Sequence, residues 1–115
     1  MEPHTIAIID DDLDMREAVA GLLASIGYVV ESFGSAEDFL SFPRRAQVDC
    51  AIVDIRMPGM SGPQLAELVR HRRPDIKIVL TSGYVSEEFL PSDVHFVPKP
   101  WRVDQVAKAV GGYQA

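Results

Sequence analysis

The sequence contains little cysteine, no long apolar run and few basic residues, and each shortage excludes a class of protein. Cys50 is the only cysteine in 115 residues, so an internal disulfide, the usual support of a small exported domain, is excluded. It lies in the apolar run CAIVDI, where we expect a small buried side chain. No run approaches the roughly 18 apolar residues that a membrane helix needs, and the N-terminal MEPHT lacks the basic region of a signal peptide. We therefore expect a cytoplasmic protein without a membrane partner.

Basic residues are outnumbered, 11 against 17 acidic ones, and the net charge is −6. Nonspecific binding to DNA relies on a basic surface, so we expect no direct DNA binding by this chain. The one basic cluster, RHRRP at 70–74, falls at the end of a predicted helix. Cations stabilise that end through the helix dipole, so the cluster has a structural explanation.

Strand-like apolar runs alternate with helical spacing along the whole chain, and the length predicts one domain, 1–115. The predicted strands are 5–9, 28–33, 48–55, 76–81 and 94–97. The predicted helices are 15–26, 35–43, a segment from Leu65 to before Pro74, and 103–110, with a weak segment at 86–93. This order predicts an α/β fold, a three-layer doubly wound five-stranded parallel sheet. The run at 48–55 is almost wholly apolar, as expected of a strand buried on both faces.

Polar side chains follow four of the five predicted strands, at the edge where such sheets bind ligands. They are Asp10 and Asp11 after the first strand, Asp54 in the third, Thr81 and Ser82 after the fourth, and Lys99 after the fifth. Each aspartate alone could be a helix N-cap, but separate caps need not fall at one edge of one sheet.

Three carboxylates gathered at that edge would destabilise the fold unless a cation were bound. An all-oxygen donor set with room for water suits magnesium. Zinc is disfavoured, because neither Cys50 nor a histidine falls there. Of the four aspartates in DDDLD, Asp10 and Asp11 belong to this edge, while Asp12 and Asp14 open the first helix and meet the positive end of its dipole. Asp12 is a candidate either for capping that helix or for bordering the site.

The segments IIDDD, VDIRMPGMSG, LTSGY and VPKPW resemble, in sequence and order, the receiver domain of two-component response regulators. The resemblance covers essentially the whole chain and implies a (βα)5 flavodoxin-like fold. It also implies magnesium-dependent transfer of a phosphoryl group from a partner histidine to Asp54, which holds it as an aspartyl phosphate. The implied partners are a sensor histidine kinase or histidine phosphotransfer protein, and a downstream protein effector. Such a domain is a signalling switch that catalyses its own phosphorylation and turns over no independent substrate.

The resemblance also implies the metal ligands. Asp11 would bind magnesium directly, with Asp54 and the backbone carbonyl of Arg56, and Asp10 would act through water or as a secondary ligand. We expect manganese to be able to substitute for magnesium.

Further roles follow from the same resemblance. Lys99 would pair with the phosphoryl oxygens, and Ser82 would donate a hydrogen bond to one of them, with Thr81 as the alternative hydroxyl. Phe96 matches the aromatic whose rotamer follows that hydroxyl, and a core phenylalanine is its other explanation. Tyr84, two residues beyond Ser82, is expected to tune the lifetime of the phosphorylated state.

One departure concerns the output surface. The stretch from Ser82 to Lys99 is shorter than in most receivers, and the missing length falls in the fourth helix, at 86–93. That helix usually belongs to the surface that dimerises or contacts outputs, so a homodimer stays open, as does the choice between a stand-alone regulator and a fragment.

Arg56, two residues beyond Asp54, is a second candidate, beside Tyr84, for tuning the lifetime of the phosphorylated state.

Other classes of protein share parts of this pattern. An aspartyl-phosphate phosphohydrolase typically carries a second acid two residues after its nucleophile, where this chain has Arg56. A flavodoxin-like nucleotide-binding module needs a phosphate loop after the first strand, where DDDLD would repel phosphate. A calcium loop would need glycine and glutamate where Met15 and Gly21 stand. The receiver interpretation is therefore preferred, with the first two classes as alternatives.

Overall fold

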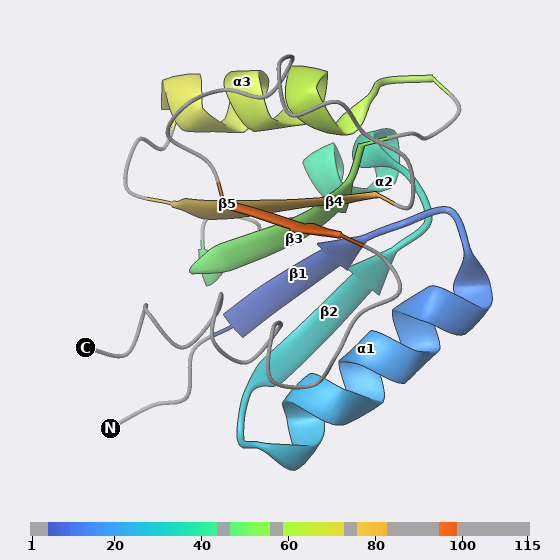
Figure 1. Ribbon diagram of the computed structural model, residues 1–115. Coiled ribbons are helices and arrows are strands. Elements are labelled where there is room, and N and C mark those ends of the chain that lie inside the picture. Colours follow the sequence, from blue (N-terminus) through green and yellow to red (C-terminus); the bar gives the residue numbers. More distant parts are fainter. Residues whose placement is uncertain (1–4, 44–46, 56–58, 73–75, 83–94, 99–115) are drawn as a thin grey trace.

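The computed structural model describes residues 5–43, 47–55, 59–72, 76–82 and 95–98. Within these residues, strands and helices alternate along the first two thirds of the chain (Figure 1). In chain order they are β1 (Thr5–Ile9), α1 (Leu13–Ser25), β2 (Val29–Phe33), α2 (Ala36–Leu40), β3 (Cys50–Asp54), α3 (Gly62–Arg72), β4 (Lys77–Ser82) and β5 (His95–Pro98). The predicted helices at 86–93 and 103–110, and with them the short fourth helix, lie outside the described residues.

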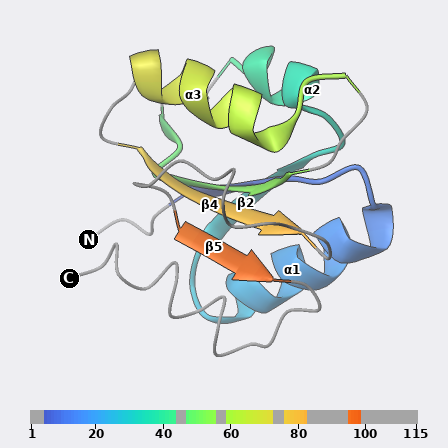
Figure 2. The ribbon, with the colours of Figure 1, turned by 45° about the horizontal axis from the view of Figure 1, so that its top comes forward.

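The strands of the described residues form one parallel five-stranded sheet in the order β2-β1-β3-β4-β5. α1 covers one face, and α2 and α3 cover the other, which gives three layers (Figures 1 and 2). The α/β doubly wound fold class is therefore confirmed. The chain first adds β2 to one side of β1 and then crosses to add β3 on the other side, so the strand order switches between β1 and β3. In such sheets a ligand site is expected at the carboxyl ends of these two strands.

Two hydrophobic clusters fill the space between the sheet and the helices. Ile6 and Ile8 belong to the cluster under α1, while Ala7 and Ile9 belong to the cluster under α2 and α3. This division follows from the period of two along a strand. β3 is buried along its whole length, as its apolar run predicted.

α1 buries only a narrow stripe of its surface against the sheet. Val19 and Leu23, one turn apart, are buried, whereas Ala18 is exposed because it lies about 100° around the helix from Val19. Ile26 is 48% exposed, because the helix ends at Ser25 and Ile26 is only its C-cap. Among the described residues, no helix is both long and apolar enough to cross a bilayer.

Cys50 is the small buried side chain that its sequence context predicted. It opens β3 with 1% of its surface exposed and forms no disulfide. Burial raises the pKa of the thiol from 9.0 to about 12, although Lys77 lowers it and Asp49 raises it further. The thiol is therefore protonated, and unreactive, across the physiological range.

The raised pKa of the Cys50 thiol predicts that the protein loses stability as the pH rises in the alkaline range. Above about pH 9 the unfolded chain releases the thiol proton while the folded chain keeps it, so the free energy of unfolding falls as pH rises. We expect this thiol to contribute a slope of up to about 1.4 kcal/mol per pH unit. Urea unfolding of wild type and Cys50→Ala between pH 7 and 10.5 measures it, because the other titrating groups are common to both. If the free energy of unfolding changed with pH in the same way in both proteins, the raised pKa of the Cys50 thiol would be contradicted.

Candidate metal centre at the carboxyl edge of the sheet

Three carboxylates converge where β1 and β3 end. Oxygen atoms of Asp10, Asp11 and Asp54 all lie within 4.8 Å of one another. The sheet register explains the meeting, because Ile9 pairs with Val53 and each is followed by an aspartate. Asp10 and Asp54 are 1% and 7% exposed, whereas Asp11 is open to solvent. The sequence predicted this gathering from the strand ends alone.

The main chain around Asp10 is held at three points. Its N–H donates to the carbonyl of Phe33 at the end of β2, at 3.1 Å. Its carbonyl accepts a hydrogen bond of 2.8 Å from Nη1 of Arg16. Its carboxylate Oδ1 accepts one of 2.9 Å from the N–H of Asp12. The turn that carries Asp10 and Asp11 is therefore fixed to β2 and to α1.

Asp12 is not part of the cluster and caps α1. Its carboxylate accepts hydrogen bonds from the N–H groups of Asp14, at 3.0 Å, and Met15, at 3.2 Å. Asp14 is exposed in the first turn of the helix. The predicted division of the four aspartates is confirmed: two join Asp54, and two lie at the positive end of the helix.

Asp54 is positioned by β4 and by the start of α3. It pairs in register with buried Thr81, and the next residue, Ile55, donates its N–H to the carbonyl of Thr81 at 2.9 Å. The carbonyl of Ile55 in turn accepts from the N–H of Gly62 at 3.1 Å. A Cβ on Gly62 would lie 2.9 Å from Cα of Ile55 and would collide with the carbonyl oxygen of Asp54. Only glycine lets α3 begin this close to the end of β3.

α3 begins with reciprocal hydrogen bonds between Ser61 and Gln64. The N–H of Ser61 donates to the side-chain oxygen of Gln64 at 2.9 Å, and the N–H of Gln64 donates to Oγ of Ser61 at 3.3 Å. This capping box satisfies N–H groups that the first turn leaves unpaired. It fixes the helix start that packs against Asp54.

The donor set fits a hard divalent cation. Three carboxylates this close repel one another, and two of them are largely shielded from water. Oxygen-only donors, with one exposed member, suit magnesium, which keeps several water ligands. The cluster contains neither histidine nor cysteine, so among the described residues it does not match a zinc site.

Several predicted site residues lie partly or wholly beyond this description. Ser82 and Phe96 lie in β4 and β5, but their side chains lie outside the described part of the structure. Arg56, Tyr84 and Lys99 lie entirely outside the described residues. The choice between Ser82 and Thr81 as the hydroxyl therefore stays open.

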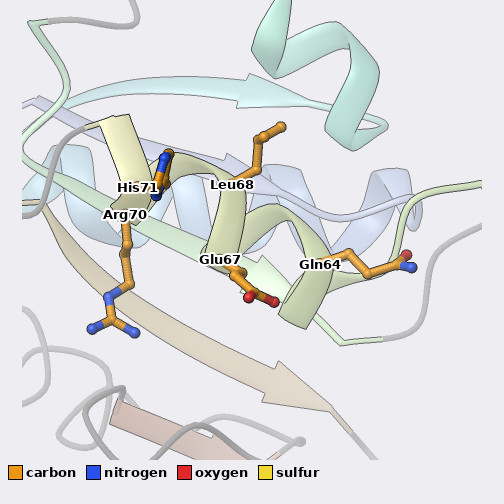
Figure 3. Close-up of a pocket in the computed structure, with 5 residues that line it drawn as sticks. All are labelled: Gln64, Glu67, Leu68, Arg70 and His71. Carbon is orange, nitrogen blue, oxygen red and sulfur yellow. The ribbon is translucent and has the colours of Figure 1, made fainter.

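A separate hollow lies on α3. Among the described residues, the side chains that line it all belong to that helix, and they fan outward rather than converging (Figure 3): Gln64, Glu67, Leu68, Arg70 and His71. A binding site usually brings several polar groups toward one point. The hollow therefore gives no second candidate for the chemistry.

Comparison with known proteins identifies the family. The family model of the response regulator receiver domain matches residues 6–111. The chain belongs to this family. The receiver domain of this chain thus has its three clustered carboxylates at the carboxyl edge of the sheet.

Curated relatives carry the same domain within longer chains. The receiver is 34% identical over 110 residues to the response regulator protein TodT of Pseudomonas putida, covering 91% of this chain and 48% of that protein. It is 34% identical over 113 residues to the sensor kinase CckA of Brucella abortus, covering 92% of this chain and 12% of that protein. The chain thus spans half or less of the length of both relatives.

Solved structures share the fold over nearly the whole chain. The response regulator TrrA of Thermotoga maritima, in complex with Mg2+–BeF, superposes with a TM-score of 0.87 at 28% identity, covering 96% of this chain and 98% of that one. A CheY-like receiver domain protein of Methanospirillum hungatei superposes with a TM-score of 0.88 at 26% identity, covering 96% and 93%.

Two residues that shape the site were not found by reading the sequence. Arg16 reaches the Asp10 carbonyl, and Gly62 packs on the Asp54 carbonyl. A glycine at the start of a helix was a usable signal for close packing. Nothing in the spacing of Arg16 distinguished it from an ordinary helix-surface arginine.

The close approach at Gly62 predicts a specific loss of stability. Gly62→Ala forces α3 away from the end of β3, and we expect the free energy of unfolding to fall by about 1–3 kcal/mol. Gly21→Ala is the matched control, because it lies within α1 with no atom within 4 Å of an added Cβ. Helix propensity should raise the stability of that variant by about 1 kcal/mol. Urea unfolding measures both, and equal stability of Gly62→Ala and wild type would refute the contact.

Proposed function

We propose that Asp54 accepts a phosphoryl group from a phosphohistidine of a partner protein, in a reaction that requires magnesium. The observation that carries this proposal is the largely buried Asp54 carboxylate within 4.8 Å of two further carboxylates at the strand switch point. Membership of the receiver family supports it. So does the likeness to TrrA, a response regulator solved in complex with Mg2+–BeF.

We assign the metal ligands from the same cluster and from the resemblance to receiver domains. Asp11 and Asp54 would bind the cation directly with the backbone carbonyl of Arg56, and Asp10 would bind through water or as a secondary ligand. When bound, magnesium would neutralise charge on the phosphoryl oxygens. Manganese, with the same preference for oxygen donors, is expected to substitute.

Asp54 would act as the nucleophile. One carboxylate oxygen attacks phosphorus in line with the histidine nitrogen, so an O–P bond forms as the P–N bond breaks. The electron pair of the broken bond returns to the imidazole nitrogen of the partner. Asp54 suits this role because β1 and β4 pair with β3 on both sides and fix its position, and alignment supplies much of the catalysis of phosphoryl transfer.

We propose that phosphorylation switches the face formed by β4, β5 and the last predicted helix. Lys99 would pair with the phosphoryl oxygens, and Ser82, or alternatively Thr81, would donate a hydrogen bond to them. Phe96 would follow that hydroxyl, and Arg56 and Tyr84 would tune the lifetime of the phosphorylated state. New charge at a fixed site can bias two packings of one face in this way.

The partners follow from the chemistry and from the relatives. The phosphoryl donor would be a sensor histidine kinase or a histidine phosphotransfer protein, and the target a downstream protein effector. Relatives of both kinds, a sensor kinase and a response regulator, contain a matching segment. We propose a cytoplasmic switch that turns over no independent substrate, without direct DNA binding by this segment. A homodimer would be one form of output.

Acetyl phosphate tests the assignment of the acceptor. With magnesium present, wild type should gain the mass of one phosphoryl group, whereas Asp54→Asn should stay at background because an amide is a poor nucleophile. Asp14→Asn is the matched control, since Asp14 is exposed and lies outside the carboxylate cluster. It should be labelled like wild type. Intact-mass spectrometry reads all three, and labelling of Asp54→Asn at the wild-type level would overturn the proposal.

A further inference from the structure

Arg16 joins α1 to the turn that carries two of the three carboxylates. Its Nη1 donates to the Asp10 carbonyl oxygen at 2.8 Å. The side chain is half-buried. A guanidinium donor makes a charge-assisted hydrogen bond, which is stronger than a bond between neutral groups. The contact is directed at the main chain that precedes Asp11.

The Asp10 carbonyl belongs to the peptide unit that links Asp10 to Asp11. This unit is planar, so holding its oxygen also orients the Cα atoms of both aspartates. The neighbouring units are held by different groups: the Asp10 N–H binds Phe33, and the Asp12 N–H binds the Asp10 carboxylate. Of these three bonds, the one from Arg16 is made by a side chain of α1. It ties the orientation of the metal turn to the position of that helix.

Gly34 limits where the Arg16 guanidinium can lie. A Cβ on Gly34 would stand 3.1 Å from Nη1 and 3.7 Å from Cζ of Arg16. Gly34 directly follows β2, whose last residue binds the Asp10 N–H. The guanidinium therefore lies against Gly34 while it donates to Asp10. The backbone of Gly34 does not have the positive φ that demands glycine, so alanine is tolerated except for this contact.

We propose that Arg16 is a positioning residue of the metal centre, which sets the placement of the Asp10 and Asp11 carboxylates by holding the peptide between them. The inference rests on the proposed function, because it takes this cluster to be the magnesium site. Arg16 acts through the main chain and needs no contact with the cation.

Two possible roles of Arg16, positioning the turn and contributing a positive charge, predict opposite changes in magnesium affinity when Arg16 is removed. If Arg16 acted only through its positive charge, removing it would strengthen cation binding, because a repelling charge would be lost. If it positions the turn, removing it weakens binding, as loss of an outer support of metal ligands typically does by about 10- to 100-fold. The sign of the change therefore separates the two roles.

The experiment is isothermal titration calorimetry of metal-free protein with magnesium chloride at fixed ionic strength. Arg16→Met should bind about tenfold more weakly than wild type. Gly34→Ala keeps every charge but displaces the guanidinium, so it should bind more weakly by a smaller factor. Arg72→Met also removes one arginine charge, but Arg72 is exposed at the end of α3 opposite to Gly62, which packs on Asp54. This variant should bind magnesium like wild type. Circular dichroism and urea unfolding without magnesium show whether each variant folds.

Each outcome decides a separate claim. Wild-type or tighter affinity in Arg16→Met would overturn the positioning role while leaving the magnesium site in place. If Arg16→Met does not fold, Gly34→Ala carries the test, and wild-type affinity in that folded variant would overturn the role. Absence of magnesium binding by wild type itself would instead overturn the proposed metal site, and the inference with it.

Discussion

The carboxylates of Asp10, Asp11 and Asp54 repel one another, and the structure around the carboxyl ends of the strands must hold them together against that repulsion. Two unit charges within 4.8 Å of each other repel by at least about 3.5 kcal/mol at an effective dielectric constant of about 20. Two of the three carboxylates are largely buried, so water screens them poorly. A fold that keeps them together must hold their main chains firmly, and a bound cation must lower their energy. The architecture of this edge meets the first need and leaves Asp11 open for the second.

Three elements that end or begin at this edge hold the cluster in place. β2 binds the Asp10 N–H through its last carbonyl, α1 begins with an Asp12 cap whose own N–H binds Asp10, and α3 begins against Asp54 at Gly62. Arg16 adds a bond from α1 to the peptide that links two of the acids. The site is therefore supported by main-chain geometry from three directions. A substitution that moves a helix start acts on the metal centre without touching a ligand.

Strand ends were predictable from the sequence, whereas the contacts between elements were not. The alternation of apolar runs located β1 and β3 and so placed Asp10, Asp11 and Asp54 at one edge, because parallel strands end together. Local capping chemistry likewise identified Asp12. Periodicity carries no information on how closely a helix approaches a strand end, so the close packing of Gly62 and the reach of Arg16 required the structure.

Urea unfolding with and without magnesium, for wild type and Asp11→Asn, tests the central claim that a cation relieves this repulsion. Without magnesium we expect Asp11→Asn to be at least as stable as wild type, because one of the three negative charges is gone. With magnesium at about 100 times its Kd, wild type should gain about 2.7 kcal/mol in free energy of unfolding, and the variant much less. Sodium chloride at matched ionic strength controls for screening. A wild-type stability indifferent to magnesium, or an equal gain in the variant, would contradict the account.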